Sequence, residues 1–325
     1  MARLLITGGA GYVGSHCVKA AAAAGHDCVV LDNLSSGHKE FARWGRLIEG
    51  DVRDAALLSK VFANERIDAV MHFAALAYVG ESVLDPGKYY DVNINGTRTL
   101  LAAMTQANVR QLIFSSTCAA YGVPATLPIS EATPLAPINP YGFTKVVCER
   151  MMEDFGNAHA LRSVRLRYFN AAGGDPDGEI GEDHDPETHL IPLILDVALG
   201  RRKTVSIFGS DYPTPDGTAV RDYIHVSDLA DAHVAALGYG LAGGASMSIN
   251  LGTGRGVSVR ELVAAAERVT GRPIKTTMGP RRAGDPPELV AEAELASRVL
   301  KWTARRSDLD RILTDAWRWH CQRFG

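Results

Sequence analysis

The chain has 325 residues, of which 46% are hydrophobic and 22% are charged, and this composition excludes a wholly disordered protein. Its 34 Lys and Arg residues against 37 Asp and Glu residues give a net charge of −3, so no basic excess indicates nucleic acid or an anionic membrane surface as a partner. Glycine is abundant, with 32 residues against a usual share of roughly 7%.

Strands and helices alternate through the first half of the chain. Short apolar runs, typical of strands buried on both faces, predict strands at Arg3–Thr7, Asp27–Leu31, Ala69–Phe73, Gln111–Ser115 and Ser163–Tyr168. Helical patterns between them predict helices at Tyr12–Ala24, Ala55–Asn64, Glu81–Ala107 and Tyr141–Phe155. This alternation predicts a parallel sheet wrapped by helices.

The regular alternation of predicted strands and helices ends after about residue 170. A long ordered loop over Ala171–Glu187 is rich in Gly, Pro and Asp, and loops of that length are usually functional. The later expected elements are a helix at Ile191–Leu199, a loop at Gly209–Gly217, a helix from near Ser227, a strand at Met247–Asn250 and a helix at Ser258–Val269. The sequence therefore predicts an α/β protein: a Rossmann-type doubly wound parallel sheet with a smaller mixed α/β C-terminal substrate domain.

A glycine-rich segment follows the first predicted strand. Gly8, Gly9, Gly11 and Gly14 lie between a strand and a helix, where missing side chains allow a tight turn and the close approach of a pyrophosphate to the helix N-terminus. Asp32 ends the second strand, 18 residues after Gly14, where a carboxylate can accept hydrogen bonds from an adenine ribose and repels a 2′-phosphate. These features predict a dinucleotide site that takes NAD in preference to NADP.

A tyrosine and a lysine lie on one face of a later helix. Tyr141 and Lys145 are four residues apart, and a nearby ammonium or a positive nicotinamide ring lowers the pKa of a tyrosine, ordinarily near 10. Thr117 follows Ser115 and Ser116 at the carboxyl end of the strand before this helix, where its hydroxyl could share a proton with a substrate. Together with the glycine loop, these groups predict hydride and proton transfer.

With these motifs the chain resembles the extended short-chain dehydrogenase/reductase superfamily and, within it, the UDP-glucose 4-epimerases (UDP-galactose 4-epimerases). The resemblance runs almost end to end. It rests on the segments Thr7–Ser15, Asp32–Leu34, Gly50–Val52, His72–Ala75, Val79–Ser82, Asn93–Thr97, Phe114–Thr117, Tyr141–Lys145, Leu166–Asn170, Phe208–Tyr212, Asp216–Val226 and Arg281–Asp285.

The resemblance implies a role for each matching residue. The cofactor residues would be Gly8, Gly11, Tyr12, Val13, Gly14, Asp32, Asn33, Asp51, Val52, Phe73, Ala74, Asn95, Tyr141, Lys145 and Tyr168, with Asp51 and Val52 bracketing the adenine. The catalytic group would be Thr117, Tyr141 and Lys145. Besides Thr117 and Tyr141, the UDP-sugar would be contacted by Asn170, His189, Leu190, Phe208, Arg221, Arg282, Asp285 and Leu289.

Within that set, Phe208 would pack against the uracil, Arg221 and Arg282 would hold the pyrophosphate, and Asp285 would accept from the uridine ribose. Residues 1–170 would form the NAD-binding domain, to which the segment of about 220–252 returns, and residues 171–325 would form the UDP-sugar-binding domain.

The implied activity is reversible epimerisation at C4 of a UDP-hexose, converting UDP-galactose to UDP-glucose through a transient 4-keto sugar with tightly bound NAD. UDP-N-acetylhexosamines remain alternative substrates, because Leu289 is of intermediate size at a position where a tyrosine would restrict the sugar pocket. The UDP-pentoses arabinose and xylose also remain, because chemistry at C4 does not involve C6. Ala77 stands where many relatives have a lysine, so one cofactor contact is in doubt.

Two other functions fit the sequence less well. A sugar-nucleotide 4,6-dehydratase would carry an Asp-Glu pair after the threonine, whereas Cys118 and Ala119 follow Thr117 here. A non-catalytic NAD-dependent sensor would be expected to lack Tyr141, Lys145 or Thr117.

The remaining expectations concern metals, location and assembly. The acidic and histidine-rich segment from Glu182 to His189 is interpreted as solvated loop charge, because Pro186 prevents its histidines from sharing a helical face, and no metal is expected. Five scattered cysteines, no apolar run long enough to span a membrane and no secretory signal predict a cytoplasmic protein with no membrane partner. The resemblance implies a homodimer formed through the helices expected at Glu81–Ala107 and Tyr141–Phe155.

Overall fold

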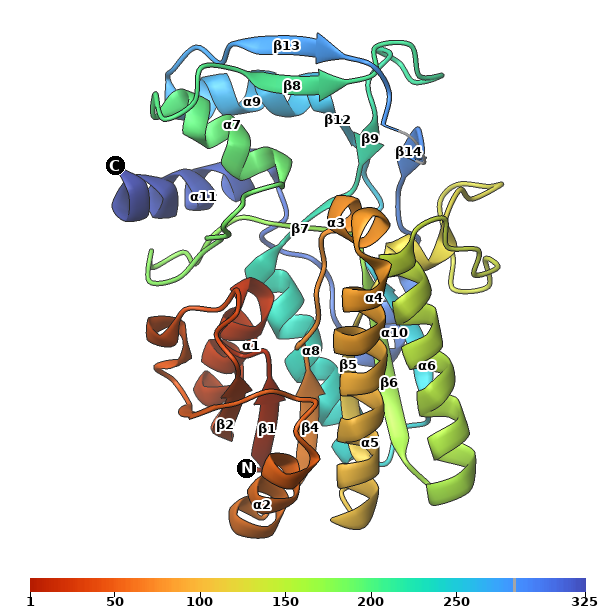
Figure 1. Ribbon diagram of the computed structural model, residues 1–325. Helices are drawn as coiled ribbons and strands as arrows, with labels where there is room; N and C mark the ends of the chain where they lie inside the picture. The colour runs from red at the N-terminus through yellow and green to blue at the C-terminus, as the bar shows by residue number, and fades with distance from the viewer. Residues whose placement is uncertain (283–284) are drawn as a thin grey trace.

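The computed structural model describes residues 1–282 and 285–325, and a parallel sheet occupies its larger part (Figure 1). Within the described residues this sheet has seven strands in the order β11-β6-β5-β4-β1-β2-β3. The strands are β1 Arg3–Thr7, β2 Asp27–Asp32, β3 Arg46–Glu49, β4 Ala69–His72, β5 Gln111–Thr117, β6 Arg162–Tyr168 and β11 Met247–Leu251. The chain therefore returns late to the far edge, where β11 pairs with β6.

Helices cover both faces of the sheet, as strands buried on both sides require. Leu4 and Ile6 of β1 pack into one core with α1 (Tyr12–Ala23), α8 (Val226–Leu241) and α10 (Glu294–Leu300). Leu5 points the other way, because side chains alternate along a strand, and packs with α2 (Ala55–Glu65), α5 (Gly96–Gln106) and α6 (Pro140–His159). This architecture confirms the predicted α/β fold class.

A smaller group of elements lies beyond the carboxyl ends of the large sheet (Figure 1). Short strands pair there in three small sheets: β7 Asn170–Ala172 with β10 Tyr223–His225, β8 Val205–Phe208 with β13 Thr276–Gly279, and β9 Val220–Arg221 between β12 Val257–Ser258 and β14 Glu288–Leu289. Three helices form a core of their own: α7 Leu190–Ala198, α9 Val259–Thr270 and α11 Leu309–Phe324. Among the described helices, none is both long and apolar enough to cross a membrane.

The structure corrects the single helix predicted at Glu81–Ala107. The segment is divided into α3 (Val79–Leu84), α4 (Pro86–Tyr89), a π-helix (Tyr90–Asn95) and α5. Pro86 stands at the first position of α4, because a proline has no backbone N–H to donate within a helix, and Asp85 caps the new start by accepting from the Lys88 N–H at 3.2 Å.

Several short elements were not predicted from the sequence. Strands β3, β8 and β13 each have four residues, and β3 and β13 expose much of their length, so they lack the buried apolar run that the other strands share. Strand β7 occupies the first residues of the predicted loop Ala171–Glu187. Short 3₁₀ helices follow at Lys39–Ala42 and Cys118–Tyr121.

A buried ion pair fastens α6 to the sheet beneath the site described below. The Glu149 carboxylate pairs with the Arg167 guanidinium of β6, whose Nε donates to Oε1 at 2.9 Å. The same carboxylate accepts from the Ser116 hydroxyl of β5 at 2.6 Å. Burial alone would raise the pKa of Glu149, but the hydrogen bonds and charge of Arg167 hold it below its ordinary value. One carboxylate thus connects the helix to two neighbouring strands.

Replacing Glu149 by Gln should destabilise the fold by about 3–5 kcal/mol, because Arg167 would remain buried without a counter-charge. The matched control is Asp154→Asn on the same helix, whose exposed pair with Arg150 should contribute at most about 1 kcal/mol. Because the folded pKa of Glu149 is lowered, its contribution is present above the unfolded value near 4.3 and is lost as the pH falls through the folded value. Urea unfolding at pH 7 and near pH 3 measures both effects, and equal losses in the two variants at pH 7 would contradict the assignment.

Candidate active site

Three of the predicted residues meet at the carboxyl end of β5. The Lys145 ammonium donates to the Ser115 carbonyl at 2.8 Å, and the Ser115 hydroxyl bonds to the Tyr168 hydroxyl at 2.7 Å. Thr117 ends the strand, and its hydroxyl accepts from the Ala119 N–H at 3.1 Å. The site is thus built on the last residues of β5, from which Lys145 and Tyr168 are positioned.

Tyr141 comes from the first turn of α6, one turn before Lys145. The helix begins sharply because the Asn139 side chain accepts from the Gly142 N–H at 2.8 Å and Pro140 fits the first helical position. Tyr141 is 9% exposed and Lys145 is 4% exposed. The two side chains therefore meet the end of β5 from one buried face of the helix, as their spacing predicts.

Burial shifts the pKa values of Tyr141 and Lys145 in opposite directions. Burial raises the pKa of Tyr141, the neighbouring Tyr168 adds to the rise, and a hydrogen bond from Thr117 opposes it. Burial lowers the pKa of Lys145 to about 8, against smaller opposing effects of Cys148 and Glu149. Burial therefore has the largest effect on the pKa of Tyr141 among the protein groups, and its predicted lowering by Lys145 and a nicotinamide ring stays a prediction.

The glycine loop forms a cradle beside this end of the sheet. Gly8 has a φ of +73°, and a Cβ there would lie 2.4 Å from the Ala74 backbone nitrogen. A Cβ on Gly14 would lie 2.1 Å from the Gly8 carbonyl oxygen, so the helix start packs directly on the loop. At Gly11 the nearest atom to such a Cβ is 3.5 Å away. The loop is therefore closed on its protein side and open at Gly11, where a pyrophosphate could approach the N-terminus of α1.

The carboxylate of Asp32 is held at the end of β2 beside this loop. Its two oxygens accept from the Ala10 and Leu34 N–H groups, each at 2.9 Å, and burial raises its pKa. Asn33 donates to Asp51 at 3.0 Å, next to the buried Val52. The residues predicted for the adenosine half are thus gathered at the ends of β2 and β3.

Other predicted cofactor residues serve the protein itself. Phe73 and Ala74 both donate their backbone N–H groups to the Thr7 carbonyl, at 2.8 and 3.0 Å, which fixes β4 against β1. The Tyr12 hydroxyl donates to the Gly173 carbonyl at 2.7 Å, so this side chain of α1 reaches the segment after β7. The side-chain oxygen of Asn95 accepts from the Arg98 guanidinium at 3.0 Å, and its amide nitrogen donates to the Asp91 carboxylate at 3.2 Å. Both hydrogen bonds are exposed.

The residues predicted for the nucleotide of the substrate lie in the smaller group of elements. The Arg221 guanidinium on β9 is paired with the Asp285 carboxylate, so the proposed diphosphate and ribose contacts are neighbours. The Arg282 guanidinium lies over the Phe208 ring, 4.1 Å from its centroid. In this arrangement the arginine covers the aromatic face that the sequence assigned to uracil.

The residues predicted for the sugar end lie on β7, at the start of α7 and on β14, where Leu289 pairs with Arg221 of β9. Asn170 begins β7, and its N–H donates to the Asp222 carbonyl at 3.0 Å. His189 and Leu190 mark the start of α7. Leu289 on β14 is buried in one cluster with Cys118, the residue that follows Thr117. The position predicted to limit sugar size thus borders the predicted catalytic threonine.

Two residues near the site were not assigned roles from the sequence. Asn93 in the π-helix donates to the Leu76 carbonyl and to the Thr144 hydroxyl, both at 3.0 Å, and so connects the segment after β4 to the first turn of α6. Glu149 stands four residues after Lys145, and the repeated spacing from Tyr141 is the signal that could have placed it on the same buried face.

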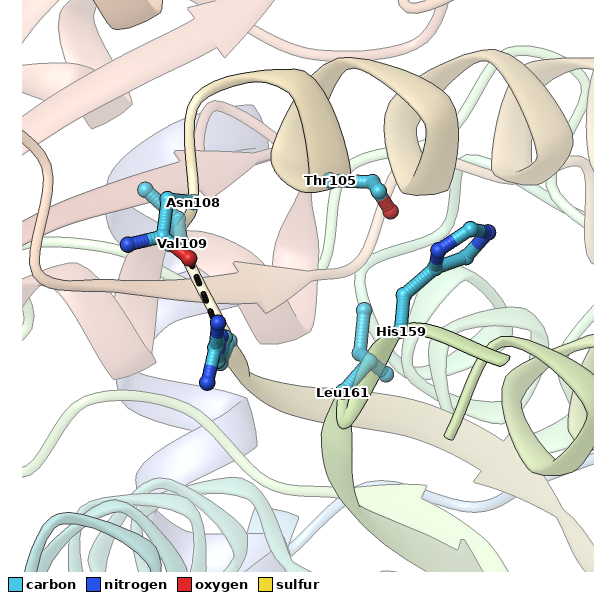
Figure 2. A pocket seen from close by; sticks show the side chains of 6 residues that line it. Thr105, Asn108, Val109, His159 and Leu161 are labelled. Carbon is cyan, nitrogen blue, oxygen red and sulfur yellow. Dashed lines mark hydrogen bonds between the residues drawn. The ribbon is translucent and has the colours of Figure 1, made fainter. Parts of the chain in front are cut away.

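A cavity of about 220 Å³ lies far from these residues (Figure 2). It is lined by Thr105, Asn108, Val109, Arg110, His159 and Leu161. These residues belong to the ends of α5 and α6 and the starts of β5 and β6, at the amino edge of the sheet. Its lining includes no predicted site residue.

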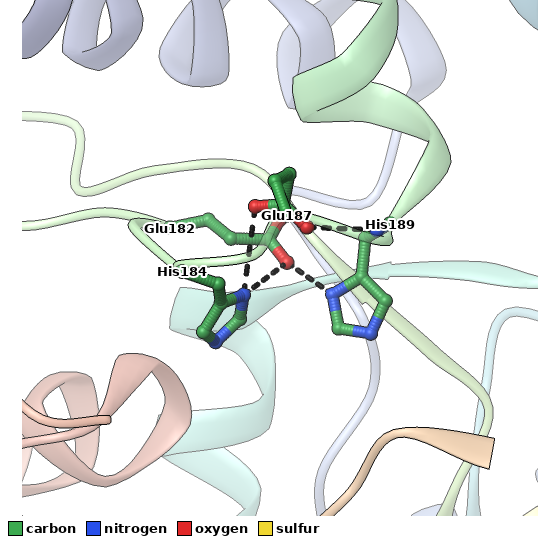
Figure 3. A group of neighbouring side chains, drawn as sticks. All are labelled: Glu182, His184, Glu187 and His189. Atoms are coloured by element: carbon green, nitrogen blue, oxygen red, sulfur yellow. Dashed lines mark hydrogen bonds and ion pairs between the residues drawn. The ribbon is translucent and has the colours of Figure 1, made fainter. Parts of the chain in front are cut away.

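The loop before α7 corrects a second expectation. Glu182, His184, Glu187 and His189 converge, with one ligand atom of each within 4.8 Å of the others (Figure 3). The Glu182 side chain is only 6% exposed. The interpretation as solvated loop charge is therefore wrong, because an irregular backbone brings the two histidines together without a helix.

Comparison with known proteins agrees with this fold. The family described as "NAD dependent epimerase/dehydratase family" matches residues 4–252. A UDP-glucose 4-epimerase of Rhizobium meliloti (strain 1021) is 53% identical over 320 residues, covering 98% of this chain and 97% of that protein. The crystal structure of UDP-glucose 4-epimerase from Brucella ovis in complex with NAD has a TM-score of 0.95 and 51% identity, covering 98% of both chains.

A UDP-glucose 4-epimerase from Stenotrophomonas maltophila, solved with bound NAD and formylated UDP-arabinopyranose, has a TM-score of 0.95 and 41% identity, covering 99% of this chain and 98% of that chain. The chain belongs to the NAD-dependent epimerase/dehydratase family. Its resemblance to the UDP-glucose 4-epimerases is confirmed along nearly its whole length.

Two glycine variants should separate the shape of the loop from its ligand. Gly14→Ala places a methyl group against the Gly8 carbonyl and should destabilise the fold by about 1–3 kcal/mol. Gly11→Ala has room for its methyl group and an ordinary backbone φ of −83°, so its melting temperature without added ligand should be nearly unchanged, while NAD binding should weaken. Thermal unfolding and the NAD released on denaturation measure the two effects. Undiminished NAD binding by Gly11→Ala would show that no ligand approaches this residue.

Proposed function

We propose that the chain catalyses the reversible epimerisation at C4 of a UDP-hexose, converting UDP-galactose to UDP-glucose through a transient 4-keto sugar with tightly bound NAD. The observation that carries the proposal is the meeting of Thr117, Tyr141 and Lys145 at the carboxyl end of β5, beside an open glycine cradle. Named relatives with this activity match over nearly the whole length.

The residues present fit NAD. The cradle is open at Gly11, and the N-terminus of α1 faces it. The Asp32 carboxylate lies at the end of β2, where it can accept hydrogen bonds from the hydroxyls of an adenine ribose. NAD, when bound, supplies a hydride acceptor that returns the hydride in the same turnover. Residues 1–170, with the segment of about 220–252, would hold this cofactor, and residues 171–325 would hold the UDP-sugar.

Tyr141 acts as the base that takes the proton of the C4 hydroxyl, directly or through Thr117. Burial raises its pKa, so the phenolate needs a positive charge beyond those of the protein. NAD, when bound, would supply that charge through its nicotinamide ring, and Lys145 would orient the nicotinamide ribose. The same tyrosine returns the proton after the keto sugar has turned over.

The substrate half anchors the intermediate through its nucleotide. Arg221 and Arg282 are rigid cations suited to a diphosphate, and Asp285, already beside Arg221, can accept from a ribose hydroxyl. Asn170 at the start of β7 and His189 and Leu190 at the start of α7 would contact the sugar end of the substrate. Because UDP stays bound, the sugar can reorient without leaving the protein.

The site does not favour the dehydratase alternative. Elimination needs an added acid and base, and Cys118 and Ala119 follow Thr117 where carboxylates would stand. Burial raises the pKa of Cys118 to about 12, so its thiol does not replace them at neutral pH.

The chain also has a surface suited to a second copy of itself. Val83, Leu84, Tyr90 and Phe143 expose 60%, 87%, 42% and 47% of their area on α3, the π-helix and α6. Exposed apolar side chains on neighbouring helices support the homodimer implied by the resemblance. Light scattering should give twice the mass of one chain.

Replacing Tyr141 by Phe should lower turnover of UDP-galactose by roughly 10²–10⁴-fold, because the proton acceptor is lost while the ring remains. UDP binding and NAD content should be unchanged. Tyr90→Phe, an exposed tyrosine near the same helix, is the control and should keep its activity. Product analysis by chromatography measures turnover, and equal rates in both variants would remove Tyr141 as the base.

Replacing Leu289 by Tyr should narrow the substrate range, because the larger ring would fill space beside Cys118 and Thr117. Turnover of UDP-N-acetylgalactosamine should fall relative to that of UDP-galactose by about 10-fold or more. Assays of both sugars and of UDP-arabinose on the unchanged chain define its range. An unaltered ratio in the variant would place the limit on sugar size elsewhere.

A further inference from the structure

The four side chains that converge before α7 have the donor set of a transition-metal site. Two imidazole nitrogens and two carboxylate oxygens are ligands that Zn²⁺ takes in four-coordinate sites. Glu182 and His184 come from the loop, Glu187 from its end and His189 from the cap of α7. Figure 3 shows the Nδ1 atoms of both histidines turned toward the carboxylates.

The spacing at His184 fits coordination better than hydrogen bonding. Its Nδ1 is buried and has no hydrogen-bond partner, and it lies 3.5 Å from Oε1 of Glu182 and 3.5 Å from Oε2 of Glu187. Ligand atoms about 2.0–2.2 Å from a tetrahedral Zn²⁺ lie about 3.3–3.6 Å from one another. A buried nitrogen without a hydrogen bond, at this distance from the buried Glu182 and the half-buried Glu187, is the observation that indicates a missing cation. Nδ1 of His189 is in direct contact with the same Oε1 of Glu182, and the two atoms would move apart on binding the ion.

The surroundings orient the ligands as an outer shell does. The second oxygen of Glu187 accepts from the N–H groups of Thr188 and His189, both at 2.7 Å, which leaves its Oε2 facing His184. Trp319 of α11 donates to the Glu182 carbonyl at 3.0 Å. The His184 ring packs edge-on against Tyr12 and Tyr78, with centroids 6.2 and 5.7 Å away.

A second carboxylate group in the same loop provides an internal comparison. Asp175, Asp177 and Glu179 also converge, but the Lys19 ammonium lies 2.8, 2.9 and 2.7 Å from their oxygens. That cluster already contains a cation. Among the described residues, no lysine or arginine pairs with Glu182 or Glu187 in this way.

We propose that Glu182, His184, Glu187 and His189 bind one divalent ion of the Zn²⁺ type. The ion would fasten the loop after β7 to the start of α7 and, through the packing of His184, to Tyr12 at the start of the cofactor helix. Its role is structural: none of its ligands takes part in the proposed proton transfer, and of the four only His189 is also assigned to the UDP-sugar.

Metal analysis of the tag-free chain tests the proposal without reference to turnover. The protein as purified should contain close to one zinc per chain. After the metal has been removed by a chelator, added Co²⁺ should give a visible absorption band typical of tetrahedral nitrogen and oxygen ligands. Added Zn²⁺ should raise the melting temperature of the metal-free chain.

The variants His184→Gln and Glu187→Gln should weaken Zn²⁺ binding by at least ~100-fold, because removing only an outer partner of a ligand costs roughly 10–100-fold. His159→Gln, an exposed histidine at the end of α6, should bind as the unchanged chain does. If His184→Gln does not fold, Glu187→Gln carries the comparison. Zinc lost on dialysis, the absence of a Co²⁺ band, or equal affinity in a ligand variant and His159→Gln would show adventitious binding and overturn the proposal.

Discussion

The hydrogen bond from Lys145 to the Ser115 carbonyl is the contact on which the site depends. A buried ammonium needs partners, and near the carboxyl end of β5 the Ser115 carbonyl accepts from Lys145. Meeting this need fixes the rotation of α6 about its axis, and Tyr141, one turn earlier, is thereby directed at the same strand end. Glu149, one turn later, holds the helix to β6 through Arg167. One helix face therefore carries both the chemistry and its anchor.

The two halves of the chain are joined at the loops that also form the site. Tyr12 begins the cofactor helix and donates to Gly173 of the segment after β7, while Lys19 of the same helix is enclosed by three carboxylates of the following loop. The loop of the smaller half is thus tied to α1, the helix that would face the cofactor. A nucleotide sugar bound between the halves would therefore contact two surfaces that these hydrogen bonds and ion pairs already hold together.

The sequence was sufficient for features that depend on local patterns. Buried strands, the glycine loop and the Tyr141–Lys145 spacing each have a signature within a few residues, and the large sheet follows from them. Features that depend on distant partners were not readable. The four-residue strands β8 and β13 are recognisable only once paired, and the convergence of His184 with His189 depends on loop backbone rather than on helical spacing. The position of Arg282 over Phe208 likewise requires two segments that are far apart in the chain.

The raised pKa of Tyr141 ties the proton and the hydride to one event. With protein groups alone, burial keeps the phenol protonated at neutral pH, so the chain holds no free base that could attack a sugar at random. With NAD bound, its positive ring would favour the phenolate of Tyr141, and that charge would be absent in the reduced cofactor. Tyr141 would then return its proton to the sugar oxygen more readily once the hydride has gone back to C4 of the sugar and the positive charge is restored. Deep burial of the tyrosine, unfavourable for a base in isolation, thus makes its basicity depend on the redox state of its neighbour.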